Sequence, residues 1–509
     1  MLVQVLSAAI IGIEAKPVRI EVELSRGIRF TLVGLPDNAV RESHERIVSA
    51  LRNNDMDIPR HQITINMAPA DMKKEGSLYD LPLAMGIMAA GEYIDAACLE
   101  NTLFMGELSL DGSLRPIKGG LPVALLAKEL GIRRLILPQS NGYEAAVVDG
   151  LEVYGFNHLK QVIQLMKGGN LPTSHIHEAV EITSNAASVP DYDEVKGMEA
   201  EIRAVEVACA GSHNLLLLGP PGAGKTMMAK RIPSILPPMS QRESLETTVI
   251  HSVAGKTTST GGLVQTRPFR SPHHSTSTIA LIGGGSKPQP GEISLAHNGV
   301  LFLDELPEFN RSVLESLRQP LEDRVIHISR SQYSVVYPAN FMLVASMNPC
   351  PCGHFNDPTQ PCVCSPGQIR HYMNKLSGPL LDRIDVQLEI APVSVEKLGS
   401  LRPGETSEAI QQRVILAREL QENRFGAQEG THCNAMMSPK QVQTFARLDR
   451  QGTMLLQEAM RRLRFSARAY DRILKLARTI ADLADSSSIQ VEHLAEAIQY
   501  RTLDKSRWM

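Results

Sequence analysis

The chain has 509 residues, of which 43% are hydrophobic. It can therefore bury large cores, and its length favours about three domains. Its formal net charge of −3 excludes bulk electrostatic attraction to nucleic acid, so any such binding requires local patches or the inner surface of an oligomer. No apolar run is long enough to span a membrane and no secretion signal begins the chain, so we expect a soluble, cytoplasmic protein with no membrane partner.

The first part of the chain, residues 1–167, alternates short apolar runs with helical patterns, which predicts an α/β domain. A polar stretch with little periodicity follows at 168–190 and predicts a domain linker. The elements expected in the first domain are strands at Val18–Leu24 and Ile63–Met67, and helices at Asn38–Asn53 and Leu81–Ala90.

A phosphate-binding loop is the clearest motif. It follows an apolar run at 214–218, which predicts a buried strand, and precedes a helix expected over 225–232. In such loops the backbone N–H groups face the β-phosphate of ATP, the lysine reaches the β- and γ-phosphates, and the hydroxyl ligates Mg²⁺. A Gly-Pro-rich turn before an ordinary helix is the alternative. The predicted ATP-binding residues are Gly219, Pro220, Pro221, Gly222, Ala223, Gly224, Lys225 and Thr226, the last of which is also a predicted Mg²⁺ ligand.

Two acids end the next predicted strand, at 300–303. Asp304 suits the Mg²⁺ shell, and Glu305 suits the base that polarises the attacking water. Many strands end in acids, so the pair alone is a weak signal. Its position about eighty residues after the phosphate loop gives it weight.

Two further polar residues suit the γ-phosphate. A strand expected at 341–346 ends just before Asn348, which either bonds the attacking water or the phosphate, or forms an ordinary turn before proline. Arg383, in Leu-Leu-Asp-Arg, suits an arginine finger that completes the site of a neighbouring subunit, with a surface salt bridge as the alternative.

The segment from 251 to 292 is rich in Gly, Ser, Thr, Pro and His and predicts a long loop. Either the loop is simply solvated or it contacts single-stranded nucleic acid. Alternation over 324–337 predicts a hairpin. The side chains that offer phosphate or stacking contacts are Arg267, Phe269, Arg270, His273 and His274.

Four of the seven cysteines lie in one window, 350–364, which has no apolar pattern to hold it together. Cys350, Cys352, Cys362 and Cys364 are predicted to bind a structural Zn²⁺ tetrahedrally, in a reducing compartment. His354 is an alternative ligand, and free thiols are the alternative to a metal site. Four cysteines leave no open coordination position for catalytic zinc.

The remainder of the chain shows helical periodicity, which predicts an all-helical lid. The helices are expected at Ser407–Asn423, Pro439–Ala446, Met454–Arg464, Ala467–Ala484 and Val491–Tyr500.

The order of these motifs resembles that of AAA+ ATPases. The segments 267–274 and 291–305 resemble the magnesium-chelatase-like branch, and the whole chain resembles the ComM family of bacterial competence proteins. The resemblance implies a homo-hexameric, ATP-driven helicase that acts on single-stranded or branched DNA in branch migration during natural transformation, with recombination proteins as further partners. It also implies that Arg468, in Ser-Ala-Arg, is a second sensor of the γ-phosphate.

The first domain resembles the proteolytic domain of Lon-type proteases, through segments 74–84, 111–121 and 131–138. The resemblance implies a ribosomal S5 domain 2-like fold. The positions of the catalytic serine and lysine fall near Leu78 and at Pro122, so we expect no protease activity and a structural or assembly role.

Three functions are therefore weighed: a DNA motor, a chelatase-type motor for metal insertion, and a Lon-like ATP-dependent protease. The expected domains are a Lon-like domain at 1–167, a linker at 168–190, an AAA+ core of magnesium-chelatase type at 191–395, which includes the cysteine window 350–364, and a helical lid at 396–509.

Overall fold

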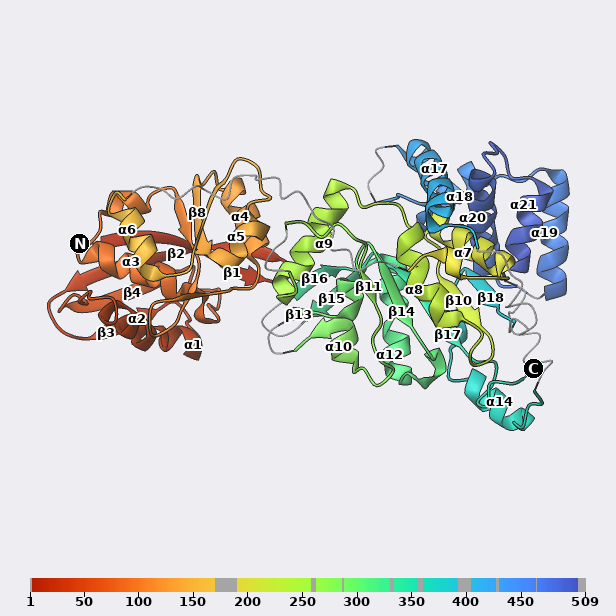
Figure 1. The fold of residues 1–509 in the computed structure, drawn as a ribbon, viewed down its shortest axis with the longest axis horizontal. Coiled ribbons are helices and arrows are strands. Elements are labelled where there is room, and N and C mark those ends of the chain that lie inside the picture. Colours follow the sequence, from red (N-terminus) through yellow and green to blue (C-terminus); the bar gives the residue numbers. More distant parts are fainter. Residues whose placement is uncertain are drawn as a thin grey trace. The chain divides into compact units, whose positions relative to one another are not determined.

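The computed structural model describes most of the chain and divides it into two compact units (Figure 1). Unit 1 comprises Met1–Asn185, Gln241–Val264 and Pro288–Pro290; unit 2 comprises Ala186–Ser240, Gln265–Lys287 and Gly291–Met509. Most of the predicted linker and the predicted boundary near 395 lie outside the described residues. The described residues are 2–169, 190–257, 262–285, 288–329, 334–355, 357, 360–391, 404–426, 430–463 and 465–501.

Unit 1 is built on a seven-stranded mixed sheet in the order β3-β4-β2-β1-β5-β8-β9. Strands β1, β2 and β4 pair antiparallel, whereas β1, β5, β8 and β9 pair parallel. The two predicted strands are confirmed as β2 and β4. The strands are β1 (Leu2–Ile11), β2 (Glu14–Ser25), β3 (Phe30–Val33), β4 (Gln62–Ala68), β5 (Thr102–Phe104), β8 (Arg134–Pro138) and β9 (Glu152–Phe156), with a small ribbon of β6 (Glu107–Leu108) and β7 (Leu114–Arg115).

The helices of unit 1 pack on this sheet. Helix α3 is buried along its whole length, as its apolar sequence requires. Inside it, the carboxylate of Asp80 accepts two bonds from Arg46 of α2, at 2.7 and 2.8 Å, which ties α2 to α3. The predicted helix at 38–53 is broken at Glu42 into two. The helices are α1 (Asn38–Arg41), α2 (Ser43–Arg52), α3 (Asp80–Ala90), α4 (Gly120–Glu129), α5 (Gln139–Ala145), α6 (Leu159–Met166) and α9 (Gln241–Ala254).

Helix α9 belongs to unit 1 although it follows the helix of the phosphate loop in sequence. Val249 is buried in the core that α4, β5 and β8 form, and Leu245 packs against it. The N–H of Gly119 donates to the carbonyl of Ser252 over 3.1 Å. The sequence analysis places α9 in the AAA+ core, because periodicity marks an apolar face without saying which core receives it.

Unit 2 contains a five-stranded parallel sheet in the order β11-β14-β17-β10-β18. The chain order reverses at β10, which lies between β17 and β18. In open parallel sheets the crevice beyond the carboxyl ends of the strands at such a reversal is where ligands bind. The strands are β10 (Leu215–Leu218), β11 (Phe269–Arg270), β14 (Val300–Leu303), β17 (Met342–Met347) and β18 (Val386–Glu389), and the predicted hairpin is confirmed as β15 (Val325–Ser329) and β16 (Ser334–Pro338).

One hydrophobic core joins this sheet to the C-terminal helices, because Leu215 and Val386 share a cluster with Ile410, Ile473 and Leu476. Within the described ranges, no helix combines the length and apolarity that crossing a membrane requires. The main helices of unit 2 are α7 (Glu199–Gly211), α8 (Lys225–Ile235), α12 (Arg311–Ser316), α13 (Arg318–Asp323), α14 (Pro366–Met373), α15 (Gly378–Leu381), α17 (Ser407–Phe425), α18 (Pro439–Phe445), α19 (Arg450–Leu463), α20 (Ala467–Leu483) and α21 (Val491–Gln499).

The loop predicted over 251–292 is in part wrong. Its described residues include the end of α9, strand β11 and the short helices α10 (Thr278–Ile282) and α11 (Glu292–Leu295). Arg267 donates to the carbonyls of Pro237 and Asn298 at 2.6 and 2.8 Å. Arg270 makes a two-bond pair with Glu292, at 2.6 and 2.8 Å. Both guanidinium groups are therefore engaged within the chain.

Candidate active site and cysteine cluster

The phosphate loop connects the carboxyl end of β10 to α8, as the motif requires. Gly224 precedes the first residue of α8 with a φ of +86°, a conformation that favours glycine. Pro221 and Gly222 are exposed at the tip of the loop. The loop thus presents backbone to solvent at a helix N-terminus, where anions bind.

Lys225 lies inside the loop and reaches the end of β17. Its Nζ donates to the carbonyls of Gly219 and Pro220, at 2.6 and 2.8 Å, and to Oδ1 of Asn348, at 2.9 Å. Burial lowers the pKa of Lys225, and the carboxylates of Asp304 and Glu305 oppose that effect. The ammonium is therefore held by neutral oxygens that a phosphate would replace.

Asp304 follows β14 and faces the other side of the loop. Its Oδ2 accepts a bond from Oγ1 of Thr226, at 2.9 Å. Its Oδ1 accepts bonds from the hydroxyl of Ser346 and from the N–H of Glu305. A hydroxyl and a carboxylate side by side form a hard oxygen donor set, which fits Mg²⁺.

Glu305 occupies the left-handed region, with φ +54°. Non-glycine residues rarely adopt this conformation, and such strain is typical of functional sites. Its carboxylate is more than half exposed and lies 3.6 Å from Nδ1 of His274, whose ring stacks on that of His273 with centroids 4.0 Å apart. The carboxylate is therefore open to water and has a polar neighbour from the segment after β11.

Arg383 follows α15 and is buried, which the sequence did not suggest. Its Nη1 donates to the carbonyl of Pro379 over 2.6 Å, and its Nη2 pairs with Glu322 of α13. The guanidinium is thus paired within the chain. Any action on a neighbouring subunit requires that it leave Glu322.

Arg468 lies in the first turn of α20, and its side chain is exposed. Ser466 caps this helix by accepting a bond from the N–H of Ala469. The Ser-Ala-Arg motif therefore combines a helix cap with an arginine that projects into solvent.

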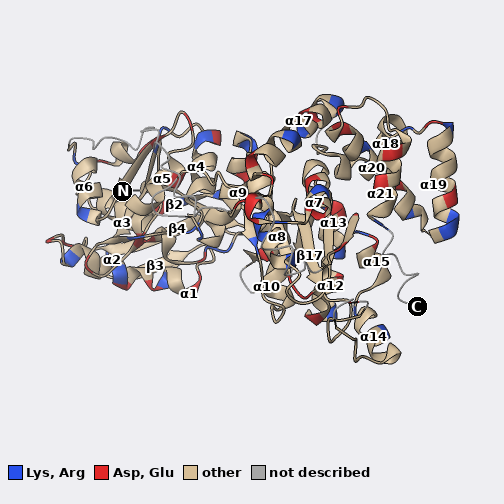
Figure 2. Cartoon of the chain, turned by 45° about the vertical axis from the view of Figure 1, so that its right-hand side comes forward, with Lys and Arg blue, Asp and Glu red and all other residues tan. Residues whose placement is uncertain are grey.

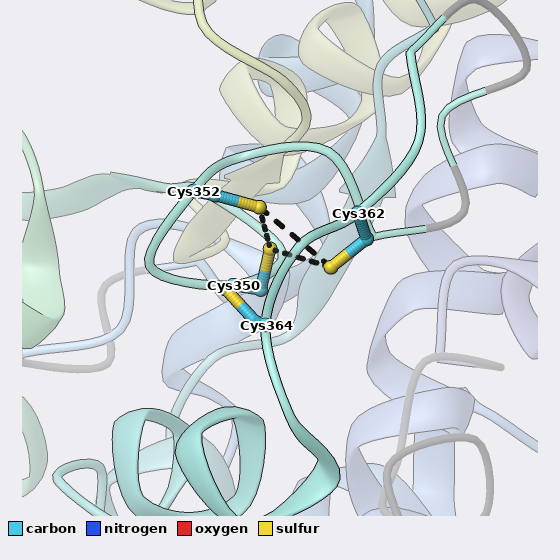
Figure 3. A group of neighbouring side chains, drawn as sticks. All are labelled: Cys350, Cys352, Cys362 and Cys364. Atoms are coloured by element: carbon cyan, nitrogen blue, oxygen red, sulfur yellow. Dashed lines mark hydrogen bonds between the residues drawn. The ribbon is translucent and has the colours of Figure 1, made fainter.

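The four cysteines of the window come together (Figure 3). Their sulfur atoms all lie within 4.8 Å of one another. Cys350 lies 3.3 Å from Cys352 and 3.7 Å from Cys362, and the latter two are 3.6 Å apart. Zn–S bonds of about 2.3 Å in a tetrahedron require sulfur atoms about 3.8 Å apart, so the donor set fits zinc.

His354 stands apart from this cluster. Its Nδ1 lies 2.9 Å from a carboxylate oxygen of Asp357, so its ring is held by an acid three residues later. The four sulfur atoms already supply the four ligands that a structural zinc takes, so the alternative in which His354 replaces a cysteine is not needed.

The cysteine window contacts the phosphate loop. Gly353 has a φ of +88°, and a Cβ built on it would lie 2.4 Å from Cδ of Pro221. Only glycine fits such a close approach. The window begins two residues after Asn348, so it is also close in sequence to the end of β17.

The resemblance to Lon-type proteases puts the catalytic serine near Leu78 and the lysine at Pro122, and both of these side chains are apolar. The hydroxyl of the neighbouring Ser77 donates to the carboxylate of Glu107. Lys118 is exposed, and its side chain lies against Gly255. Among the described residues, the Ser77 hydroxyl is bonded to a carboxylate and no bond to an amine is seen.

Comparison with known proteins places this arrangement in a family. A family described as magnesium chelatase, subunit ChlI, matches residues 191–398, and its C-terminal part matches 404–501. A further description, subunit ChlI of Mg-chelatase, matches residues 20–141. Competence protein ComM of Haemophilus influenzae is 44% identical over 506 residues, which cover 98% of this chain and 97% of that protein. The chain belongs to the magnesium-chelatase-like ComM family.

Two other relatives differ in how much of this ComM-family chain they cover. Protein YifB of Escherichia coli, named as uncharacterized, is 42% identical over 506 residues, 98% of this chain and 96% of its own. Lon protease 2 of Bacillus subtilis is 30% identical over 125 residues, only 24% of this chain and 22% of that protein. The likeness to Lon is therefore partial.

The sequence analysis missed two residues of the site of this ComM-family chain. Ser346 bonds Asp304, and its signal was a polar residue within the apolar run of β17. His274 was noted for a different role, contact with nucleic acid. No pattern in sequence indicates that it lies beside Glu305, because the two residues are far apart in the chain.

Proposed function

We propose that the chain is an ATP-hydrolysing motor that assembles as a ring, has no membrane partner, and acts on single-stranded or branched DNA. The observation that carries the proposal is the convergence of Lys225, Asn348, Thr226 and Asp304 at the carboxyl ends of three neighbouring strands. The similarity to a protein named for competence supports a role in DNA uptake and recombination, such as branch migration with recombination proteins.

The residues of one copy bind and polarise the reactants. Lys225 and the loop amides bind the β- and γ-phosphates, and Asn348 and Arg468 contact the γ-phosphate. Thr226 and Asp304 hold Mg²⁺, which neutralises charge on the phosphates when it is bound. Glu305 accepts a proton from the attacking water, for which its exposed carboxylate is suited.

Arg383 completes the site of the adjacent copy. A fixed guanidinium stabilises the charge that develops on the γ-phosphate. In the single chain, Glu322 supplies an anion to the same guanidinium. A ring, which we propose to be a homo-hexamer, lets Arg383 exchange this carboxylate for the phosphate of a neighbour.

The C-terminal helices act as a lid and offer positive charge for DNA. Between residues 439 and 470, six basic side chains are exposed against two acidic ones among the described residues. Figure 2 marks the positions of Lys and Arg on these helices in blue. This local excess contrasts with the net charge of −3 and is suited to phosphate contacts. The basic residues are Lys440, Arg447, Arg450, Arg461, Arg462 and Arg468.

The remaining parts have structural roles in this proposal. Cys350, Cys352, Cys362 and Cys364 hold a structural Zn²⁺, which replaces a hydrophobic core in the window. Residues 1–167 form a Lon-like domain that serves assembly and cuts no peptide bond, and the protein is located in the cytoplasm.

The experiment is ATP hydrolysis by the purified chain with and without forked DNA, together with casein degradation. We expect DNA to stimulate ATP turnover and casein to remain intact. Equal rates of ATP hydrolysis with and without forked DNA would contradict a motor that acts on DNA and would favour a metal-insertion motor. Casein degradation that is lost in Ser77→Ala would instead establish a protease.

A further inference from the structure

The segment that carries Arg383 is held from behind by a buried ion pair. The guanidinium of Arg472, on α20, pairs with the carboxylate of Asp385. The same Nη1 donates to the carbonyl of Arg383 over 3.2 Å. One guanidinium therefore fixes both the backbone of Arg383 and the acid two residues later.

The other side of this segment is fixed by the start of β10. Nδ2 of Asn214 donates to the carbonyl of Arg383 over 2.8 Å, and its N–H donates to Asp385 over 3.1 Å. Burial alone would raise the pKa of Asp385, but Arg472 and His213 hold the pKa well below its ordinary value. Asp385 is thus a buried anion, and the carbonyl of Arg383 has two donors.

Helix α20 carries both this ion pair and the second sensor. Arg468 and Arg472 are four residues apart, one turn of the same helix. Arg468 is exposed at the end that faces solvent, whereas Arg472 faces inward to Asp385. If Arg468 moves and α20 rotates or shifts with it, Arg472 moves as well. That movement either displaces the backbone of Arg383 or breaks the ion pair between Arg472 and Asp385.

We propose that Arg472 and Asp385 form a clamp that positions the Arg383 finger and moves it with α20. When Arg468 of one copy contacts nucleotide, the position of Arg383 in that copy changes, and with it the arginine finger at the site of the next copy. The inference rests on the proposed function, because it requires Arg383 to act on a neighbour. Arg472 and Asp385 are positioning residues, since neither touches the nucleotide.

The experiment uses two variants of the full chain that complement each other. The donor carries Glu305→Gln and keeps its finger, and the recipient carries Arg383→Ala and keeps its water activator. In mixed rings, ATP turnover arises only at a recipient site completed by a donor finger. Arg472→Lys is then added to either partner, because lysine keeps the charge but lacks the planar guanidinium whose Nη1 donates to both Asp385 and the carbonyl of Arg383.

We expect Arg472→Lys in the donor to lower complementation by about tenfold or more, since small misplacement of a catalytic group has effects of this size. In the recipient, which has no finger to position, the loss should be at least about threefold smaller. Equal losses from the two placements, or no loss from either, would overturn the clamp. If the donor and recipient without Arg472→Lys fail to complement, the proposal that Arg383 completes the site of a neighbour is wrong. The proposal of a clamp, which rests on it, is then wrong as well.

A matched control is Arg424→Lys. Arg424 pairs with Asp482 through both carboxylate oxygens in the same unit, and it is similarly buried but does not contact the segment around Arg383. We expect it to reduce complementation equally from donor and recipient. If Arg472→Lys fails to fold, the pair Arg472→Met with Asp385→Leu removes both charges of the clamp together, and the same donor-specific loss is expected.

Discussion

The two units of the chain use comparable α/β scaffolds with opposite results at the positions where chemistry is expected. In unit 2, Lys225 at the start of α8 bonds Asn348, and Thr226 beside it bonds Asp304. In unit 1, the resemblance to Lon puts the dyad near Leu78 and at Pro122, which are apolar, and the hydroxyl of the neighbouring Ser77 donates to the carboxylate of Glu107. The difference teaches that a resemblance in fold carries function only where the polar groups themselves are present.

The largest effect should come from Glu305→Gln. Glutamine keeps the shape of the side chain but accepts no proton from water, so ATP turnover should fall at least about a hundredfold while ATP binding and ring formation persist. Turnover is measured by phosphate release. Glu308→Gln, three residues on and exposed, is the control that should keep turnover. Normal ATP turnover in Glu305→Gln would show that Glu305 is not the base. The contrast between a catalytic unit 2 and a non-catalytic unit 1 would then lose its main support.

The next effect should follow removal of two ligands, Cys362→Ser with Cys364→Ser. The purified chain should hold about one zinc per copy, and the variant should hold none. Without the metal, residues 350–364 should become sensitive to proteolysis, which mass spectrometry of the fragments measures. Cys98→Ser, in unit 1, should keep the zinc. A zinc-free wild-type chain that resists proteolysis would contradict the metal site.

A smaller effect is expected at the contact between the cysteine window and the phosphate loop. Gly353→Ala adds a Cβ that would meet Pro221, so ATP affinity should fall about three- to tenfold, an effect of about 1 kcal/mol. Gly430→Ala is a matched control, because Gly430 also has a φ of +88° but has no atom within 4 Å of the added Cβ. Equal ATP affinity of the two variants, measured by calorimetry, would show that the contact does not act on the loop.

The smallest effect should be on stability as pH falls, because one buried group stabilises unit 1 and another destabilises unit 2. Burial raises the pKa of Asp80 in unit 1 to about 6, against the pull of Arg46, with Glu107 reinforcing the rise. Burial lowers the pKa of His213 in unit 2 below 6.5, against the pull of Asp385, with Lys475 and Arg472 reinforcing the fall.

Between about pH 7 and 5 the folded state of unit 1 binds the extra proton at Asp80, so this group stabilises unit 1 as pH falls. In unit 2 the unfolded state binds the extra proton at His213, so this group destabilises unit 2 over the same range. Hydrogen exchange, corrected for its chemical rate, measures both. Asp80→Asn and His213→Gln should each flatten the response of their own unit. A response of the same sign in both units would contradict these assignments.

The parts of the fold that could be predicted are those in which a local pattern has one physical meaning. The phosphate loop and the strand before Asp304 were predictable, since phosphate binding fixes residue types at fixed spacing. Helix α19 begins at Arg450, four residues before its predicted start, because the carboxylate of Asp449 accepts a bond from the N–H of Gly452 and caps the helix. That cap was visible in the sequence but was not used.

The parts that could not be predicted depend on contacts between distant residues. The attachment of α9 to unit 1, the pairing of Arg383 with Glu322, and the approach of His274 to Glu305 join segments whose sequence separation hides their contact. The contact of the His354 ring with Asp357 was likewise not evident, because nothing in the sequence marks this acid.

The central claim is that ATP is cleaved at a site that two adjoining copies share. The most direct test is the specific ATPase activity of the wild-type chain over a range of concentrations, with the mass of the assembly measured in the same samples. We predict that activity per chain falls steeply as the ring dissociates and is restored by raising the concentration. Full activity per chain in samples that contain only single copies would contradict the claim.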